Sequence, residues 1–488
     1  MSDDSIMTDE DQQHANVVPV AESEGDELPC EFQGGPDVVA VADVQPEEEV
    51  APAVGPVRPE ERVSSVDVLR GVALLGILAM NIASFGAPGS VYSNPQAGRD
   101  DWGLNDFLWT FNHLIFDTKM MSLFSMLFGA GLVLMGDRAD AKGRKFAWFY
   151  YRRVLWLLAI GLAHAYLIWT GDILVLYAQC GLLLYPLRKL APHRLLILGI
   201  CLELMMIPIF QGVLISIEFM KDTAARVETM EKAGEAVPKW RKKVGDFYKK
   251  SVEPNMKPNY ARANQARDEE LRAYRGNYGQ IVSHRAGGLF MEHTIGFILG
   301  GWWFVGGRML IGMAMMKLGV FAASRSRSFY LGMMALGYGL GMPLVIADTV
   351  LLYKHHFGGE HMMRGGFYLN FYGGLLVALG HAALVMLVYQ SGRLKWLTRR
   401  LAAVGRMALS NYLFDSILCT FIFYGYGLSL FGMLDRAGLY AIVIAIWTFQ
   451  LIISPIWLEQ YRFGPAEWVW RSLTYWKPQP MRVQPVAA

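Results

Sequence analysis

The sequence has few cysteines, and none of them is placed at the spacing of metal ligands. The four cysteines stand at positions 30, 180, 201 and 419, and three of them lie in apolar runs. We therefore expect them to pack as small apolar side chains and not to form a disulfide framework. No Walker loop, Rossmann fingerprint, HExxH or GxSxG motif is present either, so the chain offers no recognisable mononucleotide loop, dinucleotide site or hydrolase elbow, and we expect no metal.

Basic residues are missing from the first 57 positions, which contain 15 acidic residues. The rest of the chain holds all 45 Lys and Arg residues and only 28 of the 43 Asp and Glu residues. Residues 1–60 show no helical or strand periodicity, and a segment of this composition cannot bury a core. We expect a disordered acidic tail over 1–60, and not a signal peptide, because it has no basic start followed by an apolar stretch.

Long apolar runs dominate the remainder, and 53% of all residues are hydrophobic. Runs of this length are typical of membrane-spanning helices. The sequence therefore predicts an all-α fold, a polytopic membrane helix bundle with about ten transmembrane helices behind the disordered tail. We place the spans near 67–87, 119–136, 153–169, 173–187, 195–216, 303–322, 329–352, 367–390, 400–424 and 438–458.

A charged segment divides this bundle into two halves, which we place at 61–217 and 286–475. Residues 218–285 are rich in Lys, Arg and Glu with few apolar residues, which indicates an extramembrane helical insert. Residues 286–300 read as an interfacial helix, and 476–488 form a C-terminal tail.

Lys and Arg in the short loops predict the orientation of the protein in the bilayer, since such loops stay in the cytoplasm. Loops 137–153, 188–194, 322–328 and 391–400 hold six, three, two and four basic residues. With ten spans, this pattern predicts a multi-pass protein of the cell inner membrane with both termini cytoplasmic. The positive charge therefore indicates orientation, and we expect no nucleic-acid partner.

The first span carries ionisable and amide side chains along one helical stripe. Asp67, Arg70 and Asn81 follow the i, i+3, i+4 rule together with the small and apolar residues between them. Such groups in a spanning helix usually face a protein interior or a wet cavity. We expect this stripe to form one wall of an internal site. An ion pair at the membrane surface with a packing Asn is the structural alternative.

The third and fourth spans contain His164 and Asp172 on either side of a tight turn. A neutral histidine beside a carboxylate can act as a general base, because the acid fixes its tautomer. We predict this role for the pair. The alternative is a histidine bonded to a neighbouring carbonyl and an aspartate that caps the next helix.

The ninth span places Asn411, Tyr412 and Asp415 on one face. A deeply buried acid needs a partner, and we name Arg308 and His381 as candidates. A purely structural buried pair at Asp415, and a satisfied inter-helix hydrogen bond at His381, remain the alternatives.

Several motifs resemble the YeiB-like integral membrane family of bacteria. They are SVDVLRGVALLGILAMNI, SLFSMLFGAG, RRVLWLLAIGLAHAYLIWTGDILVLYAQCGLL and LAAVGRMALSNYLFDSI. The opening Asp-x-x-Arg-Gly, here Asp67, Arg70 and Gly71, is more distantly similar to transmembrane acyltransferases such as heparan-alpha-glucosaminide N-acetyltransferase. This resemblance implies transfer of an acyl group from cytosolic acyl-CoA to an acceptor, often a sugar, at the other face. The acetyltransferase uses a histidine in its first outer loop, whereas residues 92–102 contain none.

These observations give one leading hypothesis and two alternatives. The leading hypothesis is a membrane-embedded acyltransferase that takes acyl-CoA as donor and a small-molecule acceptor. His164 would act as base, Asp172 would orient it, Asn81 or Asn411 would stabilise the oxyanion, and Asp67, Arg70, Arg308 and Asp415 would bind substrate. It requires polar side chains from separate helices to meet in one chamber. The alternatives are a small-solute transporter or exporter that uses the same Asp, His and Arg groups, and a non-catalytic scaffold. The sequence leaves a homo-oligomer open.

Overall fold

A computed structural model describes residues 63–96, 103–141, 143, 146–256, 260–358 and 366–483. Within these ranges the chain is helical, and the only strand-like feature is an isolated bridge between Tyr461 and Arg482. The predicted all-α membrane bundle is therefore confirmed. The acidic tail expected over 1–60 lies outside the described residues.

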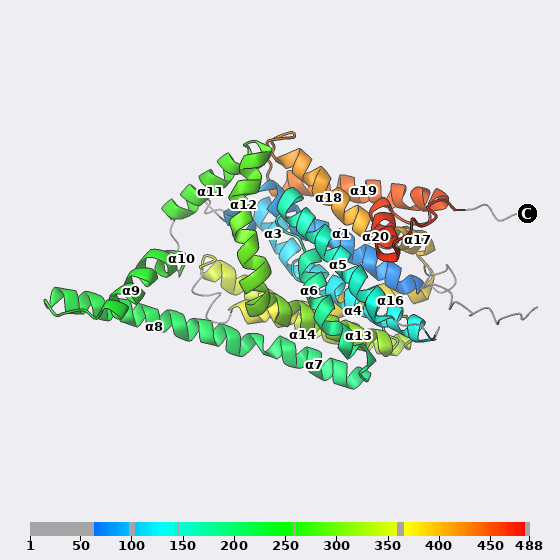
Figure 1. Ribbon diagram of the computed structural model, residues 1–488, viewed down its shortest axis with the longest axis horizontal. Coiled ribbons are helices and arrows are strands. Elements are labelled where there is room, and N and C mark those ends of the chain that lie inside the picture. Colours follow the sequence, from blue (N-terminus) through cyan, green and yellow to red (C-terminus); the bar gives the residue numbers. More distant parts are fainter. Residues whose placement is uncertain are drawn as a thin grey trace, which may run out of the picture. The chain divides into compact units, whose positions relative to one another are not determined.

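The helices follow one another with short connections (Figure 1). In chain order they are α1 (Ser64–Gly86), α2 (Gly89–Ser93), α3 (Leu104–Ile115), α4 (Lys119–Ala141), α5 (Ala147–Ala163), η2 (His164–Ile168), α6 (Leu174–Leu184), η3 (Tyr185–Lys189), α7 (Pro192–Leu204), α8 (Met206–Lys232), α9 (Lys239–Phe247), η4 (Tyr248–Val252), α10 (Glu253–Met256), α11 (Tyr260–Tyr274), α12 (Tyr278–Met291), η5 (Glu292–Gly306), α13 (Gly307–Lys317), α14 (Arg327–Lys354), α16 (Phe367–Ser391), α17 (Lys395–Arg406), α18 (Ala408–Phe423), α19 (Arg436–Gln460) and α20 (Pro465–Tyr475). Of these, η2, η4 and η5 are π-helical and η3 is a 3₁₀ turn.

Seven helical stretches of the described chain are long and apolar enough to cross a membrane. They are Ser64–Gly86, Leu104–Ala141, Pro192–Lys232, Tyr278–Lys317, Arg327–Lys354, Phe367–Ser391 and Arg436–Gln460. The expected count of about ten is not confirmed. The predicted third and fourth spans form α5 and α6, of 17 and 11 residues, and the predicted ninth span breaks between α17 and α18 at Met407.

Helix α1 lies at the centre of the bundle, and 83% of its most apolar window is buried inside the protein. It packs closely on α17 because glycines stand where the two backbones meet. A Cβ atom at Gly71 would overlap the carbonyl oxygen of Leu401, and one at Gly405 would overlap that of Asp67. The glycine of the Asp-x-x-Arg-Gly motif thus has a packing role, since any side chain there would push the helices apart.

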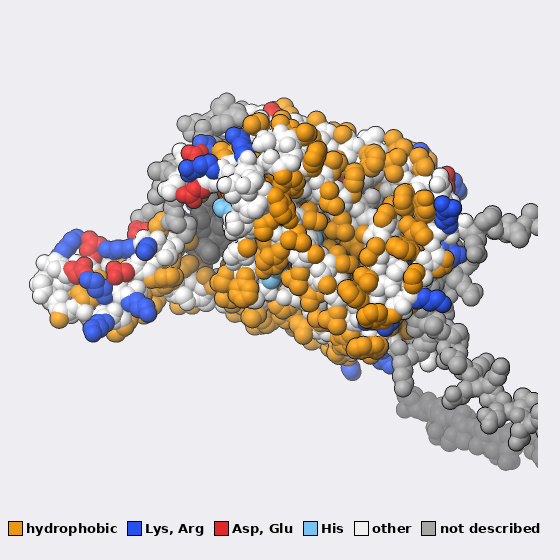
Figure 2. Space-filling model, turned by 45° about the horizontal axis from the view of Figure 1, so that its top comes forward, with side chains coloured by type: hydrophobic (Ala, Val, Ile, Leu, Met, Phe, Trp, Pro, Cys, Tyr) orange, Lys and Arg blue, Asp and Glu red, His pale blue; other side chains and the backbone are white. Residues whose placement is uncertain are grey.

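Helices α7 and α8 continue one another along the edge of the bundle (Figure 1). Only 11% of the most apolar window of this stretch is buried inside the protein, and such a surface is suited to contact with lipid. The space-filling view shows hydrophobic side chains over most of the face in view, with Lys and Arg at its edges (Figure 2). The far end of α8 is polar, and Glu228 pairs there with Lys232 at 2.7 Å and with Lys249 at 3.3 Å.

The return from the insert to the membrane differs from the expected arrangement. The sequence predicts an interfacial helix over 286–300 followed by a separate span near 303–322. In the structure α12, η5 and α13 form one continuous helical stretch over 278–317. Fifteen consecutive residues of it, Glu292–Gly306, are π-helical. The second half of this stretch contains few charged residues, so its charges do not reveal that the helix is continuous.

Candidate functional site

His164 and Asp172 are paired across the turn between α5 and α6. His164 Nδ1 lies 2.7 Å from Asp172 Oδ2, and the side chains are 1% and 0% exposed. The π-helical segment η2 begins at His164, where the backbone N–H of Trp169 donates to the His164 carbonyl at 2.9 Å. π-Helical turns occur frequently at functional sites because they re-aim side chains. The turn brings two residues that are eight positions apart into direct contact.

Asp172 also caps the helix that follows it. Its Oδ1 accepts a hydrogen bond of 2.8 Å from the backbone N–H of Val175, in the first turn of α6. Asp172 therefore makes both of the contacts considered for it: it caps α6 and it pairs with His164. Because both oxygens of Asp172 are engaged, the imidazole is held in one orientation with Nδ1 as the donor. His164 Nε2 is buried and has no hydrogen-bond partner among the described residues, so it is left as an acceptor.

A cavity of about 300 Å³ lies beside this pair. Its walls come from α1, α4, α5, the start of α6, α17–α18 and α20. The inner part is apolar and aromatic, and it ends against Ile173, Leu174, Tyr177 and Tyr412. The Tyr412 ring also contacts the His164 ring, with centroids 5.1 Å apart. The described lining does not include His164, so Tyr412 connects the cavity to the histidine.

Arginine is the main charged residue of the cavity lining. The lining contains Arg70, Arg138, Arg153, Arg406 and Arg471, against the two acids Asp67 and Glu467. Clusters of arginine favour phosphate and carboxylate groups, because each guanidinium donates several hydrogen bonds in a fixed plane. The arrangement is thus suited to an amphiphile with an anionic head and an apolar tail.

Neighbouring groups hold two of these arginines in place. Arg70 Nη1 lies 2.8 Å from Asp67 Oδ1, so the predicted charged pair of the first span exists and lines the cavity. The Arg153 guanidinium lies 3.5 Å from the centre of the Trp470 ring. The Trp470 indole in turn donates to the Arg153 carbonyl at 2.9 Å. Helix α20, outside the spans, is thereby attached to α5 at the cavity.

Glu467 joins α20 to the start of α18. Its Oε1 accepts hydrogen bonds from the backbone N–H groups of Leu409 at 2.6 Å and Ser410 at 3.2 Å, and Oε2 accepts from the Ser410 hydroxyl. Burial raises the pKa of this carboxyl. The carboxyl therefore takes the place of an N-cap at the break near Met407.

We expect Glu467→Ala to destabilise the protein by about 1–3 kcal/mol, because three donors at the start of α18, buried or partly buried, lose their acceptor. Thermal unfolding in detergent measures this loss. Glu467→Gln is the matched control, since its amide oxygen can still accept and its stability should lie closer to that of the unmodified chain. Equal stability of all three proteins would contradict the capping role.

The expectation of one shared chamber is wrong, because only Asp67 and Arg70 of the eight predicted site residues are in the described lining of the cavity. The described lining of the cavity does not include Asn81, Asn411 or Asp415. Asn411 donates to the Val404 carbonyl and to Ser454, each at 3.2 Å. Asp415 accepts from Gln450 at 2.6 Å. The structural alternative holds for Asn411 and Asp415, because Val404 on α17 and Ser454 and Gln450 on α19 are their local partners.

Arg308 and His381 are not the partners of Asp415 that the sequence suggested. Arg308 is fully buried, with its Nε 3.3 Å from Glu203 Oε1, and it donates to Ser122 and, at 3.1 Å, to the Phe371 carbonyl. His381 lies between the Tyr338 hydroxyl at 2.7 Å and the Ile115 carbonyl at 3.0 Å, which is the satisfied inter-helix bond named as its alternative. Arg308 is also absent from the described cavity lining, and its contacts are those of a structural centre between α4, α7, α13 and α16.

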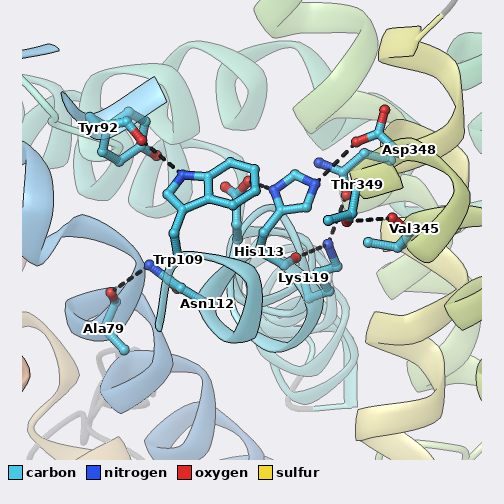
Figure 3. A network of polar contacts seen from close by, with 11 residues as sticks. Ala79, Tyr92, Trp109, Asn112, His113, Lys119, Val345, Asp348 and Thr349 are labelled. Carbon is cyan, nitrogen blue, oxygen red and sulfur yellow. Dashed lines mark hydrogen bonds and ion pairs between the residues drawn. The ribbon is translucent and has the colours of Figure 1, made fainter. Parts of the chain in front are cut away.

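A second polar cluster surrounds His113 at the end of α3 (Figure 3). His113 Nδ1 lies 3.0 Å from Asp117 Oδ2, and Nε2 lies 3.1 Å from Asp348 Oδ2 on α14. Lys119 Nζ donates to the His113 carbonyl at 2.6 Å and to Asn370 at 2.7 Å. Among the described residues, no three or more His, Cys, Asp or Glu side chains are placed to hold a metal ion. The cluster is therefore a hydrogen-bonded charge network that joins α3, α4, α14 and α16.

Sequence reasoning did not assign a role to this second cluster or to most of the cavity lining. Asp117 and Asp348 lie 231 positions apart, so nothing in the chain connects them. Arg406 also lines the cavity, from the last turn of α17 before the helix break at Met407. For α20, the Arg, Trp and Tyr residues within 470–476 could have indicated that this helix contributes to the site.

Comparison with known proteins gives relatives that match over most of their length. The model of "Protein of unknown function (DUF418)" matches residues 315–477. The uncharacterized protein YxaH of Bacillus subtilis is 31% identical over 442 residues, which cover 87% of this chain and 97% of YxaH. The uncharacterized protein YeiB of Escherichia coli is 32% identical over 428 residues, covering 85% of this chain and 96% of YeiB. No solved structure matches the chain significantly.

Proposed function

The chain belongs to the family of YeiB and YxaH, and from its cavity and buried histidine we propose that it is a membrane-embedded acyltransferase. One observation carries the proposal. A cavity lined by arginines and apolar residues ends against Tyr412, whose ring touches the buried His164–Asp172 pair. The cavity is suited to the donor, and the histidine is suited to activating the acceptor.

The donor we propose is an acyl-CoA. Its phosphates would contact the arginines, which bind such groups through charge-assisted hydrogen bonds. Its acyl chain would extend into the apolar part toward Ile173 and Tyr177, where lining aromatic and aliphatic side chains exclude water. We propose that the protein lies in the inner membrane with both termini in the cytoplasm. The arginine end of the cavity then faces the cytoplasm.

His164 supplies the base that the reaction needs. Its Nε2 would take the proton of the acceptor, and the acceptor atom would attack the thioester carbonyl carbon. The carbon–sulfur bond then breaks, and the CoA thiolate leaves and takes up the proton. Asp172 keeps the proton of the neutral imidazole on Nδ1 and stabilises the imidazolium that forms, which is the usual role of a carboxylate behind a catalytic histidine.

Tyr412 takes the role at first assigned to the two asparagines. Asn411 already donates to Val404 and Ser454, whereas the Tyr412 hydroxyl makes two long contacts, donating to the Gly171 carbonyl at 3.4 Å and accepting from the Ile173 N–H at 3.4 Å. As a donor on the cavity wall, it can turn to the developing oxyanion. The same movement would open His164 to the cavity, since the two rings are in contact.

The test is binding and turnover of labelled acyl-CoA by the purified protein in nanodiscs. We expect saturable binding and slow release of free CoA, which accelerates when an acceptor is present. Absence of binding at millimolar acyl-CoA would overturn the proposal. Acetyl-CoA and palmitoyl-CoA should be compared, because the apolar cavity predicts tighter binding of the longer chain.

Arg138→Ala and Arg406→Ala should each weaken acyl-CoA binding by roughly tenfold, since each removes charge-assisted hydrogen bonds to phosphate. The affinity should also fall as salt is raised. Arg327→Ala is the control, because Arg327 is exposed and lies outside the described cavity lining. Equal affinity in all three variants would show that the donor binds elsewhere.

A proton-coupled transporter of a small solute is the second candidate. The cluster of His113, Asp117, Asp348 and Lys119 favours it, because ionisable groups inside the membrane often form proton paths (Figure 3). Flux of protons or labelled solute into vesicles, abolished by Asp348→Asn and unaffected by acyl-CoA, would support transport in place of acyl transfer.

A further inference from the structure

Two buried polar atoms stand unpaired at the ends of the π-helical turn. His164 Nε2 and Trp169 Nε1 have no hydrogen-bond partner among the described residues. Both residues are 1% exposed. Nearly all buried polar side-chain atoms in folded proteins have a partner, so an unpaired pair in one place indicates a ligand or water that completes it. The rings lie with centroids 6.4 Å apart at an angle of 75°.

The two atoms have opposite hydrogen-bonding character. The indole Nε1–H is a donor only. His164 donates from Nδ1 to Asp172 Oδ2 at 2.7 Å, so its Nε2 is an acceptor in the neutral ring. A group that fits between them must accept one hydrogen bond and donate another. Two hydrogen bonds through one oxygen span roughly 5–6 Å from nitrogen to nitrogen, and the centres of the two rings are 6.4 Å apart.

The residues around His164 and Trp169 decide which chemical group can bind between their ring nitrogens. Trp169 stacks on Phe85 with centroids 3.9 Å apart, and the other neighbour of His164 is the Tyr412 ring. Asp172 has no free oxygen, because Oδ2 contacts His164 and Oδ1 accepts from Val175. An alkylammonium ion donates only, so it offers no acceptor to the Trp169 N–H and leaves that buried donor unpaired. A neutral hydroxyl satisfies both atoms.

We propose that the acceptor of acyl transfer is an alcohol, whose hydroxyl is held between Trp169 Nε1 and His164 Nε2. This inference rests on the proposed acyltransferase function and names its acceptor class. The hydroxyl accepts from Trp169 and donates to His164. On reaction its proton moves to His164 Nε2, its oxygen forms the new ester bond to the thioester carbonyl carbon, and the C–S bond breaks. The released thiolate takes the proton and leaves as free CoA.

The experiment compares 1-propanol with 1-propylamine, at pH 7 where the amine is an ammonium ion. Purified protein in nanodiscs receives labelled acyl-CoA with either acceptor, and ester and amide products are separated. We expect ester formation to exceed amide formation by at least tenfold. Trp169→Phe keeps the ring stacked on Phe85 but removes the donor, and should lower ester formation about tenfold without changing acyl-CoA binding. Trp447→Phe is the matched control, because its N–H bonds the Leu75 carbonyl at 2.9 Å on another part of the bundle.

Failure of this inference and failure of the proposed function give different results. Amide formed as fast as ester, or an unchanged rate in Trp169→Phe, overturns the alcohol while the acyltransferase stands. If no acyl product forms with any acceptor, the proposed function fails, and thermal stabilisation then tests the site alone. In that case 1-propanol should raise the unfolding temperature of the unmodified protein relative to Trp169→Phe, and 1-propylamine should not. An equal response of both proteins overturns the hydroxyl site, with a bound structural water as its occupant.

Discussion

His164→Asn should lower acyl transfer by roughly 10²–10⁴-fold, the range typical of a lost general base. The asparagine amide can still donate to Asp172 from the position that Nδ1 occupies, but it has no atom equivalent to Nε2. The local hydrogen bond at 2.7 Å is therefore replaced while the base is removed. Initial rates of CoA release with acceptor present, at saturating acyl-CoA, measure the effect, and donor affinity should stay within about twofold.

The controls separate catalysis from folding. Asp172→Asn should also lower the rate, because the amide can present its N–H to Nδ1 and favour the wrong tautomer of His164. His381→Asn should leave the rate unchanged, since His381 bonds Tyr338 and Ile115 in another part of the bundle. A His164→Asn protein that folds, binds donor and transfers at the full rate would exclude His164 as the base.

Arg308→Met should destabilise the bundle strongly, with a loss of about 3–5 kcal/mol. It leaves the buried Glu203 carboxyl without its partner, so that this group must either ionise unpaired or take up a proton, and it also removes the bonds to Ser122 and the Phe371 carbonyl. The unfolding temperature in detergent should fall sharply, or the protein should fail to accumulate in the membrane. Acyl-CoA affinity per folded molecule should not change, because the described cavity lining excludes Arg308.

The double variant Arg308→Met/Glu203→Met tests the cause. If the cost comes from the stranded carboxylate, the second substitution should recover a large part of the lost stability. If the double variant is as unstable as the single one, packing of the arginine between Phe304 and Phe371 is the dominant contribution instead.

Local spacing was enough to predict the parts of the site that lie close in sequence. His164 with Asp172, and Asp67 with Arg70, are separated by eight and three positions, and both pairs form. The all-α membrane bundle followed from apolar runs whose length matches a bilayer. In each case the deciding physics acts within one helix or across one turn, and the sequence contains all of it.

Partners from distant helices could not be predicted in the same way. Asp415 was expected to need an arginine or histidine, but Gln450 satisfies it. Arg308 was expected near a substrate, but it meets Glu203 from α7, which lies 105 positions earlier. These pairings depend on how helices rotate about their axes in the packed bundle. The sequence of one helix shows which residues share a face of that helix, but it does not show which other helix packs against that face.

The widened turn at the end of α5 limits which length changes the chain can tolerate. Segment η2 holds one residue more than an α-helical turn, because the Trp169 amide reaches back five positions to the His164 carbonyl. Deleting one residue within 165–168 would let the helix close with ordinary geometry and would leave the residues after it facing nearly the same way, because five steps of a π turn and four steps of an α-helix each complete little more than one revolution. Adding a residue there would instead rotate Trp169 and Asp172 by about 100° away from His164. In homologues, one-residue gaps within 165–168 should therefore be commoner than insertions, even though no side chain in that tetrapeptide is assigned a role in the chemistry.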